Sequence, residues 1–195
     1  MVVVNKHTKI ISAATKVFAK KGFFTARISD IAKEAKVADG TIYIYFSNKY
    51  DILLSIFEEE IGKIFVDTKN LLSEEDDTGR MLEIYVRQYL QAMKKNKNLG
   101  EVIQIELRQP NKVIRNYRKN QFSAYTDIIA DIVKKGQEEG IYRPEILPDI
   151  AKRIFFGALD EVSRVWNVSL ETHYTVEEIT DQVLALFLKG LLLPD

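Results

Sequence analysis

Apolar residues recur every three or four positions along almost the whole chain, the spacing that places them on one face of an α-helix. Ile10, Ala14, Val17 and Phe18 form the first such stripe, and similar stripes continue as far as Leu191. Residues that break helices are scarce, since the 195 residues include nine glycines and four prolines. The sequence therefore predicts an all-α fold of about nine helices with no convincing strand.

Capping residues indicate where several of these helices begin and end. Gly22 is expected to end the first helix in the left-handed conformation, and Ser29 to cap the second, with Asp30 in its first turn. Thr175 and Glu178 form a capping box in front of the last helix. The expected helices after the second one are residues 40–46, 48–72, 81–93, 99–107, 113–133, 148–167 and 175–192.

The composition excludes several classes of protein. Cysteine is absent, so disulfide scaffolds, thiolate metal sites and cysteine nucleophiles are excluded, and two histidines leave little for zinc or a catalytic triad. The sequence has no glycine-rich phosphate loop and no nucleophile elbow, so we expect neither an enzyme nor a metal or cofactor. No apolar run is long enough to span a bilayer and no signal peptide is recognisable, which predicts a cytoplasmic protein without membrane contact.

The overall charge of zero conceals an uneven distribution. Residues 1–50 hold nine lysines and arginines against three acids, a net charge of +6, so the remainder carries −6. A basic first quarter in a neutral chain is typical of a segment that faces an anion such as nucleic acid. A solvated basic surface without such a partner is the alternative.

Two short helices joined by a tight turn, after a supporting helix, form a helix-turn-helix pattern in this basic segment. Gly40 and Thr41 make the start of the second short helix slender enough for the major groove, and Tyr43 and Tyr45 point to different sides of it. Lys49 lies where a helix N-terminus and an ammonium can both hold a phosphate. The alternative is that the tyrosines are core residues and Gly40 an ordinary turn. We expect a DNA-binding domain at 1–47, a ligand-binding and dimerisation domain at 48–195, and DNA contacts from Thr25, Arg27, Ser29, Lys36, Ala38, Asp39, Gly40, Thr41, Tyr43, Tyr45 and Lys49.

The segment 31–46, IAKEAKVADGTIYIYF, followed by Asn48-Lys49, resembles the DNA-binding signature of TetR-family transcriptional repressors. The resemblance implies a homodimer that binds a palindromic operator and releases it when a small molecule enters the larger domain. The family usually has glycine where Lys36 stands, so a left-handed backbone there would cost about 1 kcal/mol. Asp39 is expected to cap the reading helix, or else to accept a hydrogen bond from cytosine.

Three further segments, 37–43, 106–111 and 156–161, resemble the FadR branch of that family, found in Bacillus and its relatives. This resemblance implies repression of fatty acid degradation genes and release by long-chain acyl-CoA. Apolar side chains would line a tunnel for the acyl tail, and cations such as Arg108 would hold the head. The alternative for each of these residues is an ordinary core position. The expected ligand-binding residues are Tyr89, Ile103, Leu107, Arg108, Gln109, Tyr125, Phe155 and Leu159.

The helices at 148–167 and 175–192 have apolar faces wider than one core requires, which predicts a four-helix dimer interface. The two reading helices would then face major grooves about 34–36 Å apart, and ligand would tilt the connector helix 48–72 to separate them. A multidrug-responsive repressor of the same family is the alternative, with Glu83, Glu106 or Asp160 as counter-charges. An acyl-CoA hydrolase is a further alternative, against which the sequence has no cysteine, no glycine-rich phosphate loop and no nucleophile elbow. A purely structural helical module is another, and it leaves the pattern from Gly40 to Phe46 unexplained.

Overall fold

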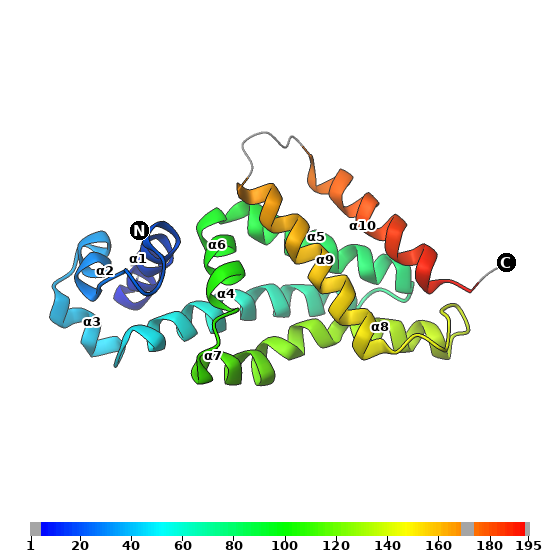
Figure 1. Ribbon diagram of the computed structural model, residues 1–195, viewed down its shortest axis with the longest axis horizontal. Helices are drawn as coiled ribbons and strands as arrows, with labels where there is room; N and C mark the ends of the chain where they lie inside the picture. Colours follow the sequence, from blue (N-terminus) through cyan, green and yellow to red (C-terminus); the bar gives the residue numbers. More distant parts are fainter. Residues whose placement is uncertain (1–4, 169–173, 194–195) are drawn as a thin grey trace. The chain divides into compact units, whose positions relative to one another are not determined.

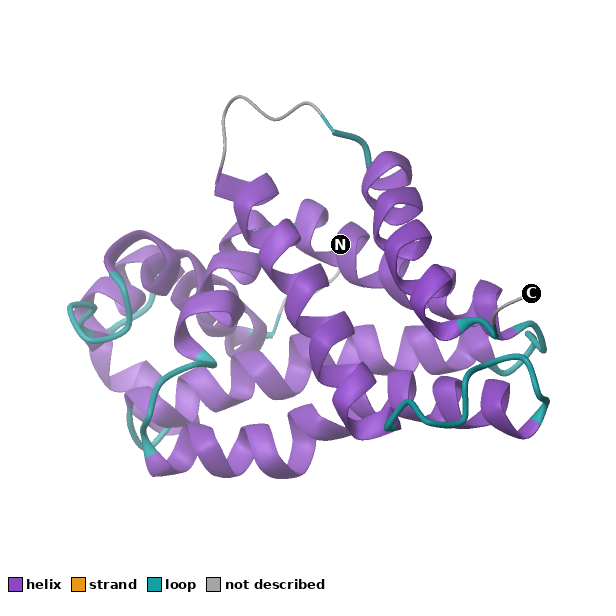
Figure 2. Ribbon diagram, turned by 45° about the vertical axis from the view of Figure 1, so that its right-hand side comes forward, coloured by secondary structure: helices purple, strands orange, loops and turns teal. Residues whose placement is uncertain are grey.

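The computed structural model describes residues 5–168 and 174–193. Within these ranges the chain is helical, and its one β interaction is an isolated bridge between Tyr142 and Leu192 (Figure 2). None of the described helices is both long and apolar enough to cross a membrane. The helices in Figure 1 are α1 (Lys6–Lys21), α2 (Ile28–Ala35), α3 (Asp39–Tyr45), α4 (Lys49–Leu72), α5 (Thr78–Lys95), α6 (Lys97–Glu106), α7 (Lys112–Tyr117), α8 (Ser123–Glu138), α9 (Pro148–Val168) and α10 (Val176–Leu191), with a π-helical turn, η1 (Arg118–Phe122), between α7 and α8.

The helices form two compact units. The first contains the chain up to Gly62 together with Asn96–Lys119, and the second contains Lys63–Lys95 together with the chain from Asn120 onward. In the first unit α1 packs against α2 and α6, and α2 packs against α3 (Figure 1). In the second unit α9 packs against α8 and α5, and α10 packs against α5. Helix α4 belongs to both units because the boundary falls within it.

The end of α1 depends on Gly22. Its backbone has φ 74° and ψ 153°, so its φ is positive as expected, but its ψ lies outside the left-handed helical region that the sequence predicted. Only glycine adopts this combination readily, because it has no Cβ. The Gly22 N–H closes the helix by donating to Phe18 O at 2.8 Å. The chain can then reverse direction and enter the loop before α2.

Helix α2 begins two residues earlier than predicted. Its N-cap is Arg27, and Ser29 lies inside the first turn, so the expectation that Ser29 caps this helix is wrong. The reason is the side chain of Asp30, which accepts a hydrogen bond from the Arg27 N–H at 3.0 Å. A carboxylate at the third helical position bonds back to the N-cap residue, which fixes the helix start at Arg27.

The single helix expected at 113–133 is interrupted by the π turn η1. The apolar pattern explains the interruption. Tyr117 and Phe122 are both buried and lie five residues apart, with polar residues between them. A π turn, with its i to i+5 hydrogen bonds, keeps both rings on the inner face, whereas an α-helix would rotate one outward. Counted as one interrupted helix, α7, η1 and α8 bring the described ranges to the nine helices expected.

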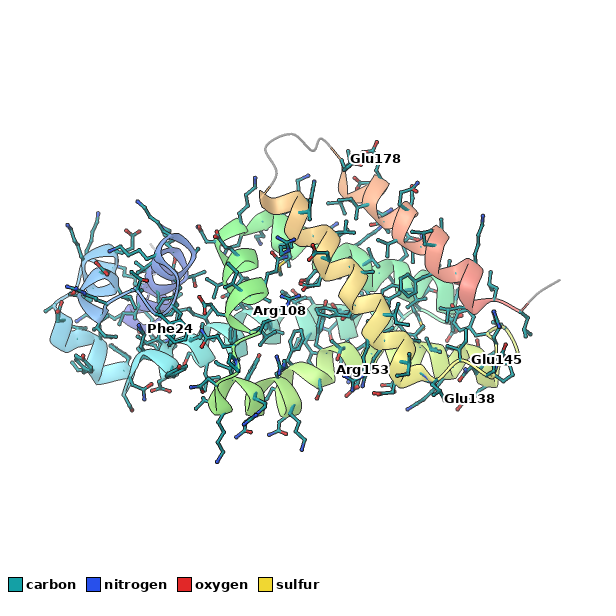
Figure 3. The ribbon with its side chains drawn as sticks, viewed as in Figure 1. Phe24, Arg108, Glu138, Glu145, Arg153 and Glu178 are labelled. Carbon is teal, nitrogen blue, oxygen red and sulfur yellow. The ribbon has the colours of Figure 1, made fainter. Side chains whose placement is uncertain are left out.

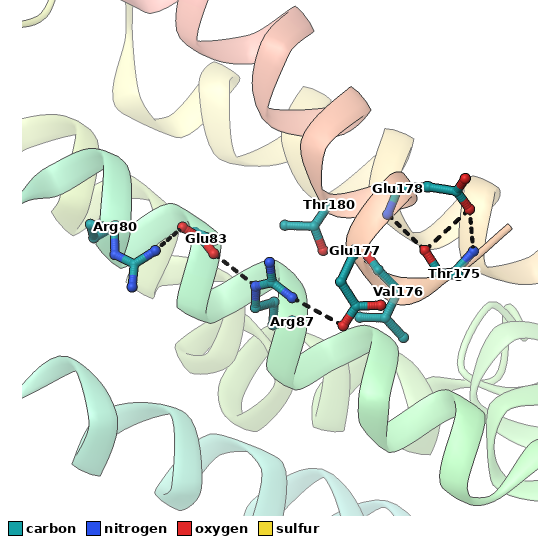
Figure 4. A network of polar contacts seen from close by, with 8 residues as sticks. All are labelled: Arg80, Glu83, Arg87, Thr175, Val176, Glu177, Glu178 and Thr180. Atoms are coloured by element: carbon teal, nitrogen blue, oxygen red, sulfur yellow. Dashed lines mark hydrogen bonds and ion pairs between the residues drawn. The ribbon is translucent and has the colours of Figure 1, made fainter.

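The second unit is stabilised at its surface by polar contacts between α5 and α10 (Figure 4). Arg87 donates to Glu83 at 2.8 Å on its own helix and lies 3.4 Å from Glu177 on α10. The predicted capping box is present, since Thr175 Oγ1 accepts from the Glu178 N–H at 3.1 Å and the Glu178 carboxylate accepts from the Thr175 N–H at 2.7 Å. These contacts fix where α10 begins.

Candidate nucleic-acid interface and effector site

The outer side of α3 is a solvent-exposed aromatic and apolar surface. Tyr43 is 59% exposed and Ile44 77% exposed, whereas Ile42 is fully buried beneath them and Phe46 is buried at the helix end. Tyr45 is also exposed, and its ring lies near that of His7 on α1. Each residue predicted to contact DNA is exposed or partly exposed. The alternative that these tyrosines belong to the core is therefore wrong.

The Lys49 side chain supports the loop before α2. Its ammonium donates to Phe24 O at 3.1 Å and to Ala26 O at 2.9 Å, and it lies 4.6 Å from the centre of the Phe23 ring. Burial lowers the pKa of Lys49, and the nearby Glu106 carboxylate opposes that change. Lys49 therefore holds the loop that carries two of the predicted DNA contacts, Thr25 and Arg27.

The turn between α2 and α3 contains a non-glycine residue in the left-handed conformation, Lys36, with φ 55° and ψ 48°. The strained turn geometry considered from the sequence is therefore present. The N-cap of α3 is Ala38, and no side chain caps this helix, so the expectation that Asp39 is the cap is wrong. Asp39 lies instead in the first turn, where a carboxylate interacts favourably with the positive end of the helix.

A buried carboxylate connects α6 to the same loop, and this contact was not predicted from the sequence. Glu106 is 4% exposed, and its carboxylate accepts a hydrogen bond from the backbone N–H of Phe23 at 2.9 Å. The amide of Gln109, predicted to bind ligand, also donates to this carboxylate, while Gln109 Oε1 has no hydrogen-bond partner. The sequence carries no signal for this contact, because α6 also contains a second acid, Glu101, and neither acid identifies a distant partner.

The predicted ligand-binding residues of the first unit all lie on α6 or just after it. Ile103 and Leu107 are buried and frame Glu106 along the helix. Arg108 is exposed, and its guanidinium donates to Gln104 O one turn earlier (Figure 3). The apolar pair and the adjacent cation thus lie on the helix whose carboxylate holds Phe23.

The predicted ligand-binding residues of the second unit lie in a buried aromatic cluster: Tyr89, Tyr125, Phe155 and Leu159. The ring of Tyr125 stacks on that of Tyr85 with centroids 4.9 Å apart. The hydroxyl groups of both residues are buried without a hydrogen-bond partner, and burial raises the pKa of both phenols. Buried hydroxyl donors without a partner are uncommon in folded proteins.

The three acids considered as counter-charges for a cationic drug already accept hydrogen bonds inside their own units. Glu83 accepts from Arg87, Asp160 accepts from Tyr89, and Glu106 accepts from the loop before α2. Among the described residues there is also no group of three or more histidines or acids suited to a metal ion.

Comparison with known protein families gives two matches that together cover most of the chain. Residues 10–56 match the family described as bacterial regulatory proteins, tetR family. Residues 57–190 match the family described as YsiA-like protein, C-terminal region. The first match contains α2, α3 and the exposed aromatic surface.

Individual relatives are similar over nearly the full length. The fatty acid metabolism regulator protein of Bacillus subtilis (strain 168) is 32% identical over 186 residues, which cover 95% of each chain. The crystal structure of the transcriptional regulator FadR from Bacillus subtilis in complex with stearoyl-CoA has a TM-score of 0.87 and covers 94% of this chain and 98% of that one. The fatty acid degradation regulator FadR from Bacillus halodurans is 34% identical, with a TM-score of 0.87, covering 97% of this chain and 98% of that one.

Proposed function

Because the chain belongs to the tetR family of bacterial regulatory proteins, we propose that it is a repressor that binds a palindromic operator as a homodimer and releases it when a long-chain acyl-CoA binds. The family makes it a helix-turn-helix transcriptional regulator rather than an enzyme. We further propose that the genes it controls serve fatty acid degradation.

The observation that carries the choice of effector is the full-length similarity to a regulator crystallised with stearoyl-CoA. The chain's own residues support the same class of ligand. Its buried apolar and aromatic side chains suit an acyl tail, since ligand sites for such molecules are mostly apolar with a few placed polar groups. The unpartnered phenols of Tyr85 and Tyr125 supply such polar groups, because each can donate to a carbonyl oxygen like that of a thioester.

The charges in the two units favour this effector over a cationic drug. A drug cation needs a carboxylate that is free to face it, and the three acids considered for that role are already engaged. Leaving the buried donors of Asp160 and Glu106 unpartnered would cost roughly 1–3 kcal/mol for each group. A neutral thioester and an apolar tail require no such exchange.

The contacts of α6 suggest how effector binding affects the helix-turn-helix formed by α2 and α3. Ile103 and Leu107, the proposed tail contacts of the first unit, lie on the helix that carries Glu106. A shift of this helix moves the carboxylate that holds the Phe23 N–H, and with it the loop that leads into Thr25 and Arg27. The effector changes operator affinity only to the extent that it binds the shifted arrangement more tightly.

The homodimer is proposed on the exposed apolar residues of the last two helices. Ile150, Ile154, Val162 and Val165 form a stripe along α9, and Leu186 is 78% exposed on α10. Apolar side chains at this spacing suit the packing of two helices against their copies in a four-helix arrangement.

The experiment is operator release measured by fluorescence anisotropy, with an operator selected from random duplexes by the purified protein. Stearoyl-CoA is expected to release the duplex, whereas free CoA and stearate are controls that carry only one part of the ligand. Tyr125→Phe is expected to weaken the response to stearoyl-CoA without changing operator affinity. Tyr142→Phe is the matched control, because the Tyr142 hydroxyl is also buried without a partner but is not a proposed ligand contact.

Full operator binding at saturating stearoyl-CoA would remove the acyl-CoA proposal. Release by cationic drugs, together with no response to acyl-CoA, would support the multidrug alternative instead.

A further inference from the structure

The basic charge of the first 50 residues is mostly remote from the recognition helix. Helix α3 contains no lysine or arginine, and the Lys49 ammonium is bonded to two backbone carbonyls. Two adjoining hollows along α1, of about 560 and 370 Å³, share Lys16 and Glu34 and together form one groove, termed here the α1 groove. Six of the nine cations line it: Lys9, Lys16, Lys20, Lys21, Lys33 and Lys36.

The α1 groove carries an excess of unpaired positive charge. Its two acids are already neutralised, since Asp30 lies 2.7 Å from Lys21 and Glu34 lies 3.4 Å from Lys16. The other four lysines are exposed and have no ion-pair partner within the described part of the chain: Lys9, Lys20, Lys33 and Lys36. Four mutually repelling ammonium groups around one groove are stabilised when an anionic partner enters it.

The side chains of the α1 groove match those that contact nucleic-acid backbones. Lys9, Ser12, Lys16 and Lys20 lie on one face of α1, and the outer two are separated by about 16 Å along the helix axis. One strand of duplex DNA presents about five phosphates over that length. Ammonium and hydroxyl groups are common phosphate donors, and no aromatic side chain lines the groove to stack on a base.

One end of the α1 groove is continuous with the reading surface. Lys36 lines the groove and lies in the turn that leads into Ala38, the N-cap of α3. We propose that the α1 groove is a second, sequence-independent DNA contact that holds the phosphate backbone beside the base pairs read by α3. The proposal rests on the proposed function as an operator-binding regulator. It assigns affinity and salt dependence to α1, and sequence preference to α3.

The test compares two variants of the full chain that lose the same number of charges. The first combines Lys9→Gln, Lys20→Gln and Lys33→Gln, which removes unpaired lysines of the α1 groove. The control combines Lys69→Gln, Lys134→Gln and Lys189→Gln, three exposed lysines of the second unit. Operator affinity is measured between about 50 and 300 mM salt, with a scrambled duplex of equal length alongside.

We expect the first variant to bind both duplexes at least about tenfold more weakly at 0.1 M salt, with an unchanged ratio between operator and scrambled DNA. The slope of log affinity against log salt should decrease in magnitude by about 5, because the homodimer loses six lysines and each lost phosphate contact removes roughly 0.9. The control variant should retain the slope of the original protein. Both variants should unfold at the same denaturant concentration as the original protein.

The proposal would be overturned if the two variants showed equal salt slopes. It would also be overturned if the first variant lost only a second, weaker duplex-binding event and kept the salt slope of the original protein for the operator. If the unmodified protein binds no duplex at all, the proposed function itself fails, which is a different result.

Discussion

Replacement of Glu106 tests the contact between α6 and the loop before α2. The carboxylate accepts hydrogen bonds from the Phe23 N–H and the Gln109 amide in a buried position. Glu106→Leu keeps a similar volume but leaves both donors without an acceptor, and each unpartnered buried group costs about 1–3 kcal/mol. The expected loss is therefore about 2–6 kcal/mol of the free energy of unfolding, a large fraction of the roughly 5–15 kcal/mol typical of a folded protein.

Glu106→Gln separates hydrogen bonding from charge. Its amide oxygen can still accept from the Phe23 N–H, so we expect a smaller loss of about 1 kcal/mol, the difference between a charged and a neutral acceptor. The assay is urea unfolding followed by circular dichroism, with the midpoint and slope compared among variants. Glu101→Gln is the matched control, because Glu101 lies on the same helix and is exposed. A Glu106→Leu protein as stable as the original would refute the reasoning.

The same variants distinguish a coupling role from a purely structural one. If α6 transmits effector binding through Glu106, the Glu106→Gln protein should bind stearoyl-CoA and operator separately while the effect of one on the other decreases severalfold. Coupling free energies of about 1–3 kcal/mol correspond to affinity ratios of roughly 5–150, so the change is measurable by anisotropy. An unchanged ratio together with a lowered unfolding midpoint would assign Glu106 a structural role only.

Three further predictions concern stability. Gly136→Ala should lower the free energy of unfolding by about 1–3 kcal/mol, because the new Cβ would lie 2.1 Å from the Tyr142 ring, and thermal melting measures it. Lys36→Gly should raise the melting temperature slightly, since relief of the left-handed strain, about 1 kcal/mol, is partly offset by the greater freedom of unfolded glycine. Hydrogen bonds from Lys152 and then Arg153 lower the pKa of Asp149 in the folded chain, so its contribution is complete above about pH 4 and is lost as the pH falls further. Asp149→Asn should therefore lower the urea midpoint more at pH 6 than at pH 3, and an equal decrease at both pH values would contradict this assignment.

Elements defined by local periodicity were predictable from the sequence, and contacts between distant residues were not. The stripe through Ile10 and Phe18 and the box at Thr175 each depend on neighbours within one or two turns. The start of α2 was misplaced because Arg27 and Ser29 both precede Asp30. The sequence does not show which of these two residues is the N-cap that bonds to the Asp30 carboxylate. The bond from Phe23 to Glu106 joins residues 83 positions apart, and no pattern in either segment identifies the other.

The number of basic residues in the first quarter of the chain predicts that the protein binds DNA. It does not predict which of these residues contact the DNA. Lys21 pairs with Asp30 and Lys49 anchors a loop, so neither ammonium is fully available to a phosphate. The reading helix itself presents Tyr43 and the hydroxyl of Thr41, which are uncharged groups suited to base edges. We therefore expect attraction and recognition to come from separate elements and to separate in experiment. Tyr43→Ala should change which sequences are preferred with the salt slope retained, whereas loss of the α1 groove lysines should do the reverse.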